Sequence, residues 1–382
     1  MKLIRPEPPK KEEKIVDISF NVHKFNNRPR PKDPNKIVII GSFSEFGCET
    51  VSVLYSIPII LQQCCGRYVI IVGWYGREYL YRHLADEFWE LKEEFQWLRE
   101  YSRAFHHQSE NLKQLETRIA SYGKFFSTQF LSIPIIHNRC SCGYCWSYND
   151  DIDSCPKCHN TEITRAVFKD VPFWKRLAIK LPSPSREKLY RARTYVKENT
   201  VGIFARARKT YGRNLTPEFY VDLIKLVREL GYEPIWLGEK TSILPCPVDD
   251  VVDFAYLDES KDLELTFAIV RQCKFTIQFW TASTRIAGMQ GIPYLLFESP
   301  DQIWGIGQEG YRRNLCDWGS SKLCVSHFLS VLDNPKEGLA LVKRCIEEMQ
   351  VNNYDDVFGM LENEMVARTM RHNNLERIGG VS

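Results

Sequence analysis

The chain has 382 residues and a nearly balanced charge, with 51 lysines and arginines against 48 aspartates and glutamates. A formal net charge of +3 argues against a protein that coats nucleic acid through charge alone. Apolar residues make up 44% of the chain, enough for two ordinary domains or one large α/β unit. Residues 51–61 form the longest apolar stretch, which is too short to cross a bilayer, and residues 1–14 contain no apolar run of the secretory kind. We therefore expect a soluble, cytoplasmic protein with no membrane span.

Residues 1–35 contain six prolines and little hydrophobic periodicity. This composition predicts an N-terminal arm that lies on the surface or is partly disordered. Two interpretations of the arm remain open. It is either a solvated tail or a segment that contacts an anionic acceptor or a partner subunit.

A βαβ unit is predicted directly after the arm. Residues 36–41 (KIVIIG) and 67–73 (RYVIIVG) are continuous apolar runs that end in glycine, as buried parallel strands do. A helix over 48–63 connects them.

The next segment has helical periodicity. Apolar residues recur at steps of four and three and predict one long helix, or two consecutive helices, over 77–105; the positions are Leu80, Leu84, Phe88, Leu91, Phe95 and Leu98. A helix over 111–122 and a strand over 130–136 are predicted to follow.

Residues 138–165 carry the spacing of a zinc-binding module. Two C-x2-C pairs, each able to turn two thiolates toward one metal ion, predict a closed tetrahedral site that holds structural Zn2+; the ligands are Cys142, Cys145, Cys155 and Cys158. Cys140, His137 and His159 lie close enough in sequence to replace one ligand. The remaining cysteines are scattered through apolar stretches. One cluster with scattered single cysteines is typical of a protein from a reducing compartment.

After a proline-bearing connection that ends near residue 189, the alternation of strands and helices starts again. We predict strands over 200–205, 233–238, 251–256, 274–279 and 293–297, and helices over 218–230, 262–272, 283–290, 328–349 and 354–370. Repeated alternation of this kind is typical of a parallel, doubly wound sheet. The chain is therefore predicted to be α/β, with two Rossmann-like doubly wound domains at 36–190 and 191–350, an inserted zinc-ribbon module at 138–165, and a C-terminal helix at 351–382.

The loop after the first strand lacks the dinucleotide-binding fingerprint, which argues against a dehydrogenase. It carries two carboxylates, Glu45 and Glu49, where a group transferase would need a base to deprotonate an acceptor hydroxyl. Glu45 is the first candidate and Glu49 the second. An acid in the first turn of a helix also favours the helix dipole without any catalytic role, and that alternative stays open for both.

The loop after the strand at 200–205 gathers four cations, Arg206, Arg208, Lys209 and Arg213. Arginine binds phosphate oxygens through two parallel hydrogen bonds, so this loop is a candidate site for a diphosphate. The alternative is that these cations lie on a solvated loop and bind no ligand.

A second candidate phosphate site follows the strand at 274–279. Thr281, Ser283 and Thr284 lie before a predicted helix, where hydroxyls and free backbone N–H groups can hold a phosphate. Ser283 or Thr284 also fits a simple helix cap. Glu298, after the next strand, is a candidate contact to a ribose or base.

At these residues the sequence resembles the GT-B glycosyltransferases, in particular the ADP-heptose/lipopolysaccharide heptosyltransferase-like group. The resemblance is carried by the segments IFARARKTYGRNLTPEFY (203–220) and FWTASTRIAGMQGIPYLLFE (279–298) and by the layout of strands over 36–73. The family's histidine at the start of the late helix is Arg285 here, and the zinc module is not part of the family pattern. The resemblance implies a GT-B fold, a nucleotide-sugar donor bound mainly by the C-terminal domain, and an acceptor bound by the N-terminal domain. Three classes of acceptor stay open: a glycan, a lipid-linked sugar and a nucleic acid.

Three other functions stay open. A sugar-nucleotide epimerase would use the same two domains without an acceptor. A nucleic-acid-modifying glycosyltransferase would clamp a polyanion with the zinc module and the basic stretch at 169–193. A non-catalytic zinc-ribbon binding protein would use the module as a docking surface.

Overall fold

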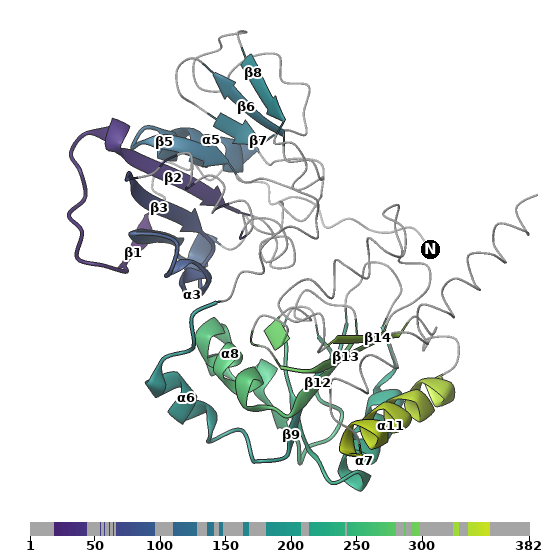
Figure 1. Cartoon of the computed structure of the whole chain (residues 1–382). Helices are drawn as coiled ribbons and strands as arrows, with labels where there is room; N and C mark the ends of the chain where they lie inside the picture. The colour runs from purple at the N-terminus through teal and green to yellow at the C-terminus, as the bar shows by residue number, and fades with distance from the viewer. Residues whose placement is uncertain are drawn as a thin grey trace, which may run out of the picture. The chain divides into compact units, whose positions relative to one another are not determined.

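The computed structural model of the chain divides into two compact units, Met1–Glu45 with Ser56–Phe168, and Phe46–Tyr55 with Lys169–Ser382. We call them unit 1 and unit 2 and describe each by itself (Figure 1). The structure describes residues 19–43, 54, 57, 61, 64, 66–95, 110–127, 136–140, 145–147, 163–167, 181–207, 214–240, 243–279, 286–287, 290, 292–297, 324–327 and 335–351.

Unit 2 contains a six-stranded sheet in which every neighbouring pair is parallel. The order across the sheet is β11-β10-β9-β12-β13-β14. The strands are β9 (Thr200–Phe204), β10 (Glu233–Trp236), β11 (Val252–Asp253), β12 (Phe275–Phe279), β13 (Tyr294–Phe297) and β14 (Cys324–His327). Most of these residues are apolar because a parallel sheet is covered on both faces.

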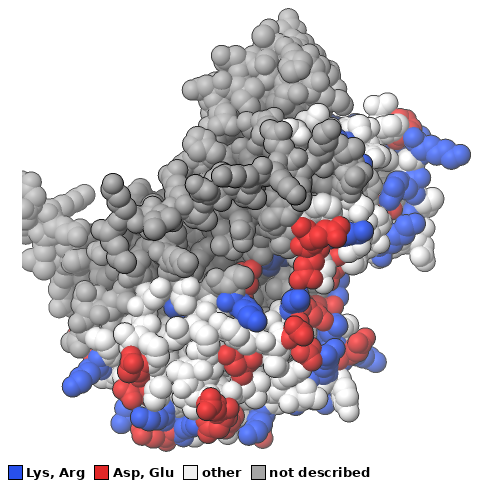
Figure 2. All heavy atoms as spheres, turned by 180° about the vertical axis from the view of Figure 1, so that it is seen from behind, with Lys and Arg blue, Asp and Glu red and all other residues white. Residues whose placement is uncertain are grey.

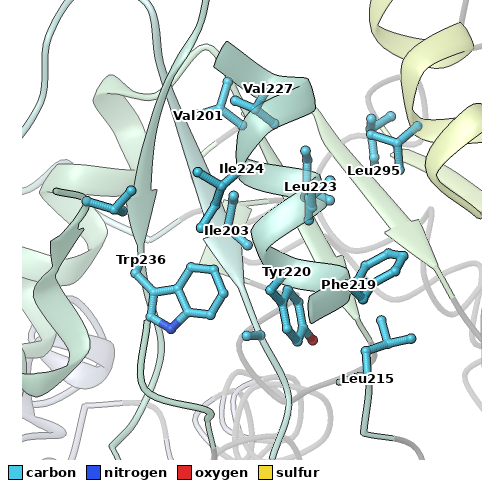
Figure 3. Close-up of a cluster of buried hydrophobic side chains, with 14 of the residues drawn as sticks. Val201, Ile203, Leu215, Phe219, Tyr220, Leu223, Ile224, Val227, Trp236 and Leu295 are labelled. Carbon is cyan, nitrogen blue, oxygen red and sulfur yellow. The ribbon is translucent and has the colours of Figure 1, made fainter. Parts of the chain in front are cut away.

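Two helices cover one face of this sheet, α7 (Pro217–Glu229) and α11 (Pro335–Val351). The apolar side of α7 packs on alternate residues of β9 and on the indole of Trp236 (Figure 3). The Thr216 side chain caps α7 by accepting a hydrogen bond from the Phe219 N–H at 3.3 Å, and Pro217 takes the first helical position. Helix α8 (Leu263–Gln272) lies on the opposite face (Figure 1).

Unit 1 contains an eight-stranded mixed sheet with the order β1-β4-β3-β2-β5-β7-β6-β8. Its central strands β4, β3, β2 and β5 are mutually parallel, and helix α5 (Glu110–Ala120) packs against them. The strands are β1 (Phe20–Lys24), β2 (Ile37–Ser42), β3 (Tyr68–Gly73), β4 (Glu87–Leu91), β5 (Lys124–Ser127), β6 (Ile136–Cys140), β7 (Cys145–Ser147) and β8 (Ile163–Val167).

One prediction for unit 1 was wrong. The long helix expected over 77–105 is replaced by the short helix α3 (Glu78–Tyr81), by strand β4, and by a single 3-10 turn at Glu93–Phe95. Within the arm predicted at 1–35, residues 20–24 form the exposed or half-buried strand β1, which pairs with β4 in antiparallel fashion. The apolar residues of β4 coincide with a helical period, and only the pairing with β1 and β3 makes them a strand.

Strand β4 is unusual because acidic residues at or beside it are buried. Asp86, Glu87 and Glu90 are 7%, 0% and 5% exposed. Buried carboxylates are costly unless they are paired and hydrogen-bonded. The segment that contains β1 supplies most of the partners.

Glu87 is the most enclosed of the three. Its Oε1 accepts hydrogen bonds from the Tyr68 hydroxyl at 2.8 Å and from Arg30 Nε at 3.2 Å, and its Oε2 accepts one from Trp89 Nε1 at 2.9 Å and pairs with the second guanidinium nitrogen of Arg30. Burial alone would raise the pKa of Glu87, but the hydrogen bonds from Arg30, Trp89 and Tyr68 outweigh burial and leave this pKa below its usual value. Burial and the Glu87 carboxylate raise the pKa of Tyr68 to about 12.

Side chains from residues 21–28 bind the other two buried acids, Asp86 and Glu90. Asn26 Nδ2 donates to Asp86 Oδ1 at 2.8 Å, and Arg28 contacts Asp86 Oδ2 at 3.4 Å. Asn21 Nδ2 donates to Glu90 Oε2 at 3.1 Å. Arg28 also donates to the carbonyl oxygens of residues 66 and 67. Part of the predicted surface arm therefore forms the edge of the sheet of unit 1 and supplies hydrogen bonds to its buried acids.

Most other predicted elements are confirmed. The structure has strands at or within one residue of the predictions at β2, β3, β9, β12 and β13, a somewhat shorter β10, and helices at α5, α7 and α8. The strand predicted over 251–256 is shorter, because β11 ends at Asp253 and a 3-10 turn at Phe254–Tyr256 follows. Helix α6 (Arg186–Ala192) and strand β14 were not predicted. The helix predicted over 354–370 lies outside the described residues, as do most of the helices predicted over 48–63 and 283–290.

Candidate functional site

The strand order of unit 2 defines where a ligand would bind. From β9 the chain proceeds through α7 to β10 and β11 on one side, whereas β12, β13 and β14 extend the sheet on the other side. The direction of winding therefore reverses between the neighbours β9 and β12. In open parallel sheets, ligands bind beyond the carboxyl ends of the strands at this reversal. Strands β9 and β12 are neighbours at this point, and the sequence places its candidate phosphate-binding residues directly after these two strands.

Arg206 lies two residues beyond β9 and is 3% exposed. Its backbone N–H donates a hydrogen bond to the Tyr220 hydroxyl of α7 at 3.2 Å. The Tyr220 ring lies edge-on to Trp236, with ring centroids 5.2 Å apart, and burial raises the pKa of Tyr220. Tyr220 thus stays neutral and fixes the point at which the chain leaves the sheet. Sequence reasoning missed this residue, because it appears there as one more apolar position of α7.

The other predicted donor-site residues lie outside the described residues. These are Arg208, Lys209, Arg213, Thr281, Ser283, Thr284 and Glu298. Their predicted roles in binding a diphosphate or a ribose remain predictions.

Strand β12 carries a polar pair that the sequence analysis did not single out. Thr276 and Gln278 are both 0% exposed, and Gln278 Nε2 donates to Thr276 Oγ1 at 2.5 Å. No hydrogen-bond partner of Gln278 Oε1 is found among the described residues. Gln278 pairs in register with Phe204, the last residue of β9, so its amide lies beside the reversal point. Two polar residues at alternate positions of an otherwise apolar strand were the available signal.

The loop after β10 borders the same edge of the sheet. Gly238 has a φ of +138°, and a Cβ placed on it would lie 2.4 Å from Ile243 Cγ2. Only glycine fits such a backbone and such a contact. Trp236 Nε1 donates to the Leu244 carbonyl at 2.7 Å, which holds the loop against the core.

In unit 1 the corresponding reversal lies between β2 and β5. Ser42 ends β2 and is fully buried, with its Oγ 2.6 Å from the Tyr81 hydroxyl of α3. The candidate bases Glu45 and Glu49 follow within seven residues of this strand, but both lie outside the described residues. Their catalytic role is a prediction that rests on the sequence.

The predicted zinc ligands are described only in part. Cys142, Cys155 and Cys158 lie outside the described residues, and for Cys145 the structure describes the backbone of β7. Within the described part of the chain, no three His, Cys, Asp or Glu side chains are arranged to hold a metal ion.

The described helices include none with the length and apolar character needed to cross a bilayer.

Comparison with known proteins places this geometry among solved structures. No protein-family description and no curated protein sequence matches the chain. Its structure is similar to that of the ADP-heptose LPS heptosyltransferase II of E. coli, with a TM-score of 0.50 and 11% identity over 82% of this chain and 99% of that one. The chain has the GT-B fold. The two-sheet α/β architecture expected from the resemblance is thereby confirmed, and the inserted zinc ribbon remains a prediction.

Two further structures show weaker likeness. One is the family 9 glycosyl transferase of Veillonella parvula DSM 2008, with a TM-score of 0.47 and 11% identity over 80% of this chain and 89% of that one. The other is the E. coli heptosyltransferase WaaC with ADP, with a TM-score of 0.42 and 14% identity over 82% of this chain and 99% of that one.

Proposed function

We propose that the chain is a glycosyltransferase that moves a sugar from a nucleotide-sugar donor to an acceptor hydroxyl. The observation that carries this proposal is the reversal of strand order between the neighbours β9 and β12, the two strands that are followed in sequence by the arginines and by the hydroxyl residues. The GT-B fold shared with a heptosyltransferase supports it.

In the proposed reaction the acceptor oxygen forms a bond to the anomeric carbon while the bond from that carbon to the diphosphate breaks. The acceptor proton passes to a carboxylate, for which Glu45 is the first candidate and Glu49 the second. Negative charge develops on the leaving nucleoside diphosphate, where arginine side chains stabilise it most. Arg208 and Arg213 are proposed for this role with Lys209, while Arg206 anchors the start of the loop through Tyr220.

Charge on the described surface of unit 2 argues against a polyanion as a general ligand. Lys188 of α6 pairs with Asp262 at 2.5 Å, and Arg191 pairs with Glu259 at 3.2 Å. Hydrogen bonding to Asp262 raises the pKa of Lys188 and keeps it charged. On the face in Figure 2, basic and acidic side chains are interspersed among the described residues. Two cations of the basic stretch at 169–193 are thus neutralised locally.

The donor is tested by thermal unfolding of the full chain with UDP, GDP, ADP or CDP. A nucleotide at about a hundred times its dissociation constant adds about 2.7 kcal/mol to the free energy of unfolding. One of the four is expected to raise the melting temperature. If none does, the proposal fails.

The roles of individual residues are tested by variants. Replacing Arg208 and Arg213 together by alanine is expected to abolish the nucleotide-dependent shift, whereas Arg193→Ala, at the exposed end of α6, leaves it unchanged. Glu45→Gln is expected to lower the rate of sugar transfer by about 10²- to 10⁴-fold while nucleotide binding persists. Consumption of donor at an undiminished rate without an acceptor would instead indicate an epimerase.

A further inference from the structure

One row of residues crosses the sheet of unit 1 at its carboxyl edge. Because β2, β3 and β4 are parallel and β1 pairs with β4, the register places four residues opposite one another; they are Ser42, Gly73, Glu90 and Asn21. Residues that lie opposite one another in a sheet direct their side chains to the same face. The row therefore runs along one face from the edge strand β1 to Ser42, the last residue of β2.

Glu90 connects β1 to the turn that follows β3. Its Oε2 accepts a hydrogen bond from Asn21 Nδ2 at 3.1 Å and lies 3.3 Å from His23 Nε2, and both of these partners belong to β1. Its Oε1 accepts a hydrogen bond from the backbone N–H of Gly76 at 2.8 Å, two residues before α3. The two oxygens of one buried carboxylate thus hold β1 and the turn between β3 and α3.

Aromatic rings continue the path from β1 to the end of β2. The ring centroid of His23 lies 6.3 Å from that of Phe88, and Phe88 stacks on Tyr81 of α3 with ring centroids 5.5 Å apart. Gly73 leaves room for this stack, because a Cβ placed on it would lie 3.0 Å from the Phe88 ring. The Tyr81 hydroxyl lies 2.6 Å from Ser42 Oγ. Helix α3 is thus held against both β4 and the end of β2.

We propose that Glu90 and Tyr81 are positioning residues for the acceptor side of the proposed reaction, and that β1 holds them in place. Only the link to the reaction rests on the proposed function, since the contacts themselves lie within unit 1. The candidate bases Glu45 and Glu49 follow Ser42 by three and seven residues in sequence, so the end of β2 is where their segment leaves the sheet. A shift of about 1 Å in a reacting group costs about 100-fold in rate.

The first test is hydrogen exchange of the full chain, which needs no substrate. Replacing Asn21 and His23 together by alanine is expected to speed exchange of the Gly76 amide about tenfold, because Glu90 loses both partners on β1. The matched control Val22→Ala, at the 48% exposed residue between them, is expected to leave this amide unchanged. Unchanged exchange in the double variant, or equally faster exchange in α5, overturns the specific link through Glu90.

The second test compares two removals of a buried tyrosine hydroxyl. Tyr81→Phe removes the contact with Ser42 at the carboxyl edge, whereas Tyr68→Phe removes a hydrogen bond to Glu87 from the first residue of β3, at the amino edge. Tyr81→Phe is expected to speed exchange of the amides at 41–43 about fivefold, and Tyr68→Phe to leave them unchanged. Equal exchange at 41–43 in the two variants overturns the role of Tyr81.

The link to the reaction is tested by release of nucleotide from UDP-, GDP-, ADP- and CDP-sugars, with water as the acceptor. Tyr81→Phe is expected to lower kcat about 10- to 100-fold with an unchanged KM for the donor, and Tyr68→Phe to alter neither constant. An unchanged kcat in Tyr81→Phe, or a change in KM alone, overturns the positioning role. If the wild-type chain releases no nucleotide and no nucleotide raises its melting temperature, the proposed transfer fails, and the exchange measurements still decide whether β1 holds the end of β2.

Discussion

The two sheets share a central plan but stabilise it differently. In each, the first three parallel strands lie in reverse order and the fourth pairs with the first, as β4-β3-β2-β5 in unit 1 and β11-β10-β9-β12 in unit 2. The core of unit 2 on the α7 side is apolar. Unit 1 buries three carboxylates at β4 and covers them with the segment at residues 20–30.

This difference shows two ways of ending a sheet. In unit 2 the strand β11 contains only two residues, so the edge is short. In unit 1 the edge beyond β4 is paired with β1, and the buried acids accept hydrogen bonds from asparagine and arginine side chains of that segment. Buried acids therefore make unit 1 depend on a distant piece of the chain, and unit 2 has no comparable cluster among its described residues.

The largest effect is expected from Arg30→Ala. This change removes the cation from Glu87, whose carboxylate is fully buried, and also removes the contact of Arg30 with the Trp89 ring, 5.1 Å away. Leaving a buried charge without its cation costs about 2–3 kcal/mol here, since Tyr68 and Trp89 still donate to Glu87. Hydrogen exchange of β3 and β4 amides during mild urea unfolding measures this loss.

The matched control is Lys32→Ala, which alters an exposed cation two residues away. It is expected to change stability by less than about 0.5 kcal/mol. Equal behaviour of the two variants would mean that the buried acids do not depend on the arm. Exchange of α7 amides should stay unchanged in both.

The next largest loss of stability is expected from a change to the backbone of unit 2. Gly238→Ala is expected to destabilise unit 2 by about 2 kcal/mol, because the new methyl group meets Ile243 at 2.4 Å on a backbone with φ of +138°. Gly231 also has a positive φ, +86°, but nothing lies within 4 Å of a Cβ added there. Gly231→Ala is therefore expected to lower the free energy of unfolding by only about 1 kcal/mol. Urea unfolding followed at α7 compares the two. A larger loss for Gly231→Ala would contradict the steric argument.

The response to acid is expected to be smaller and opposite in the two units. The pKa of Glu87 is lowered in the folded state, so its stabilisation is present above the ordinary value of 4.5 and is lost as pH falls through the lower folded-state value. Burial raises the pKa of Asp253 above 3.8, so its carboxylate costs stability at neutral pH, and protonation on acidification removes that cost.

Urea unfolding at about pH 7 and about pH 4, followed at β4 and at α7 by a hydrogen-exchange pulse, checks this prediction. Glu87→Gln is expected to flatten the acid response of unit 1, and Asp253→Asn that of unit 2. A decline in both units that these variants leave unchanged would show that other groups control the acid response.

The sequence predicted the candidate site better at the level of loops than of side chains. The run before Arg206 and the run before Trp280 were both recognised as strands, so the two loops were correctly placed after β9 and β12. That β9 and β12 are neighbours could not be predicted, because strand order depends on pairings such as Gln278 with Phe204, 74 residues apart in the chain. The roles of Tyr220 and Gln278 depend on the same pairings and were missed.

By itself the sequence determined strands β2, β3, β9, β10, β12 and β13 and helices α5, α7 and α8. Strands buried on both faces must be continuously apolar, and caps such as Thr216 act within a few residues, so both signals are local. Only the tertiary structure decided that residues 87–91 form a strand and that residues 20–24 belong to the sheet. The deciding interaction, Arg30 with Glu87, joins residues 57 positions apart, and no local pattern of apolar residues records such a pair.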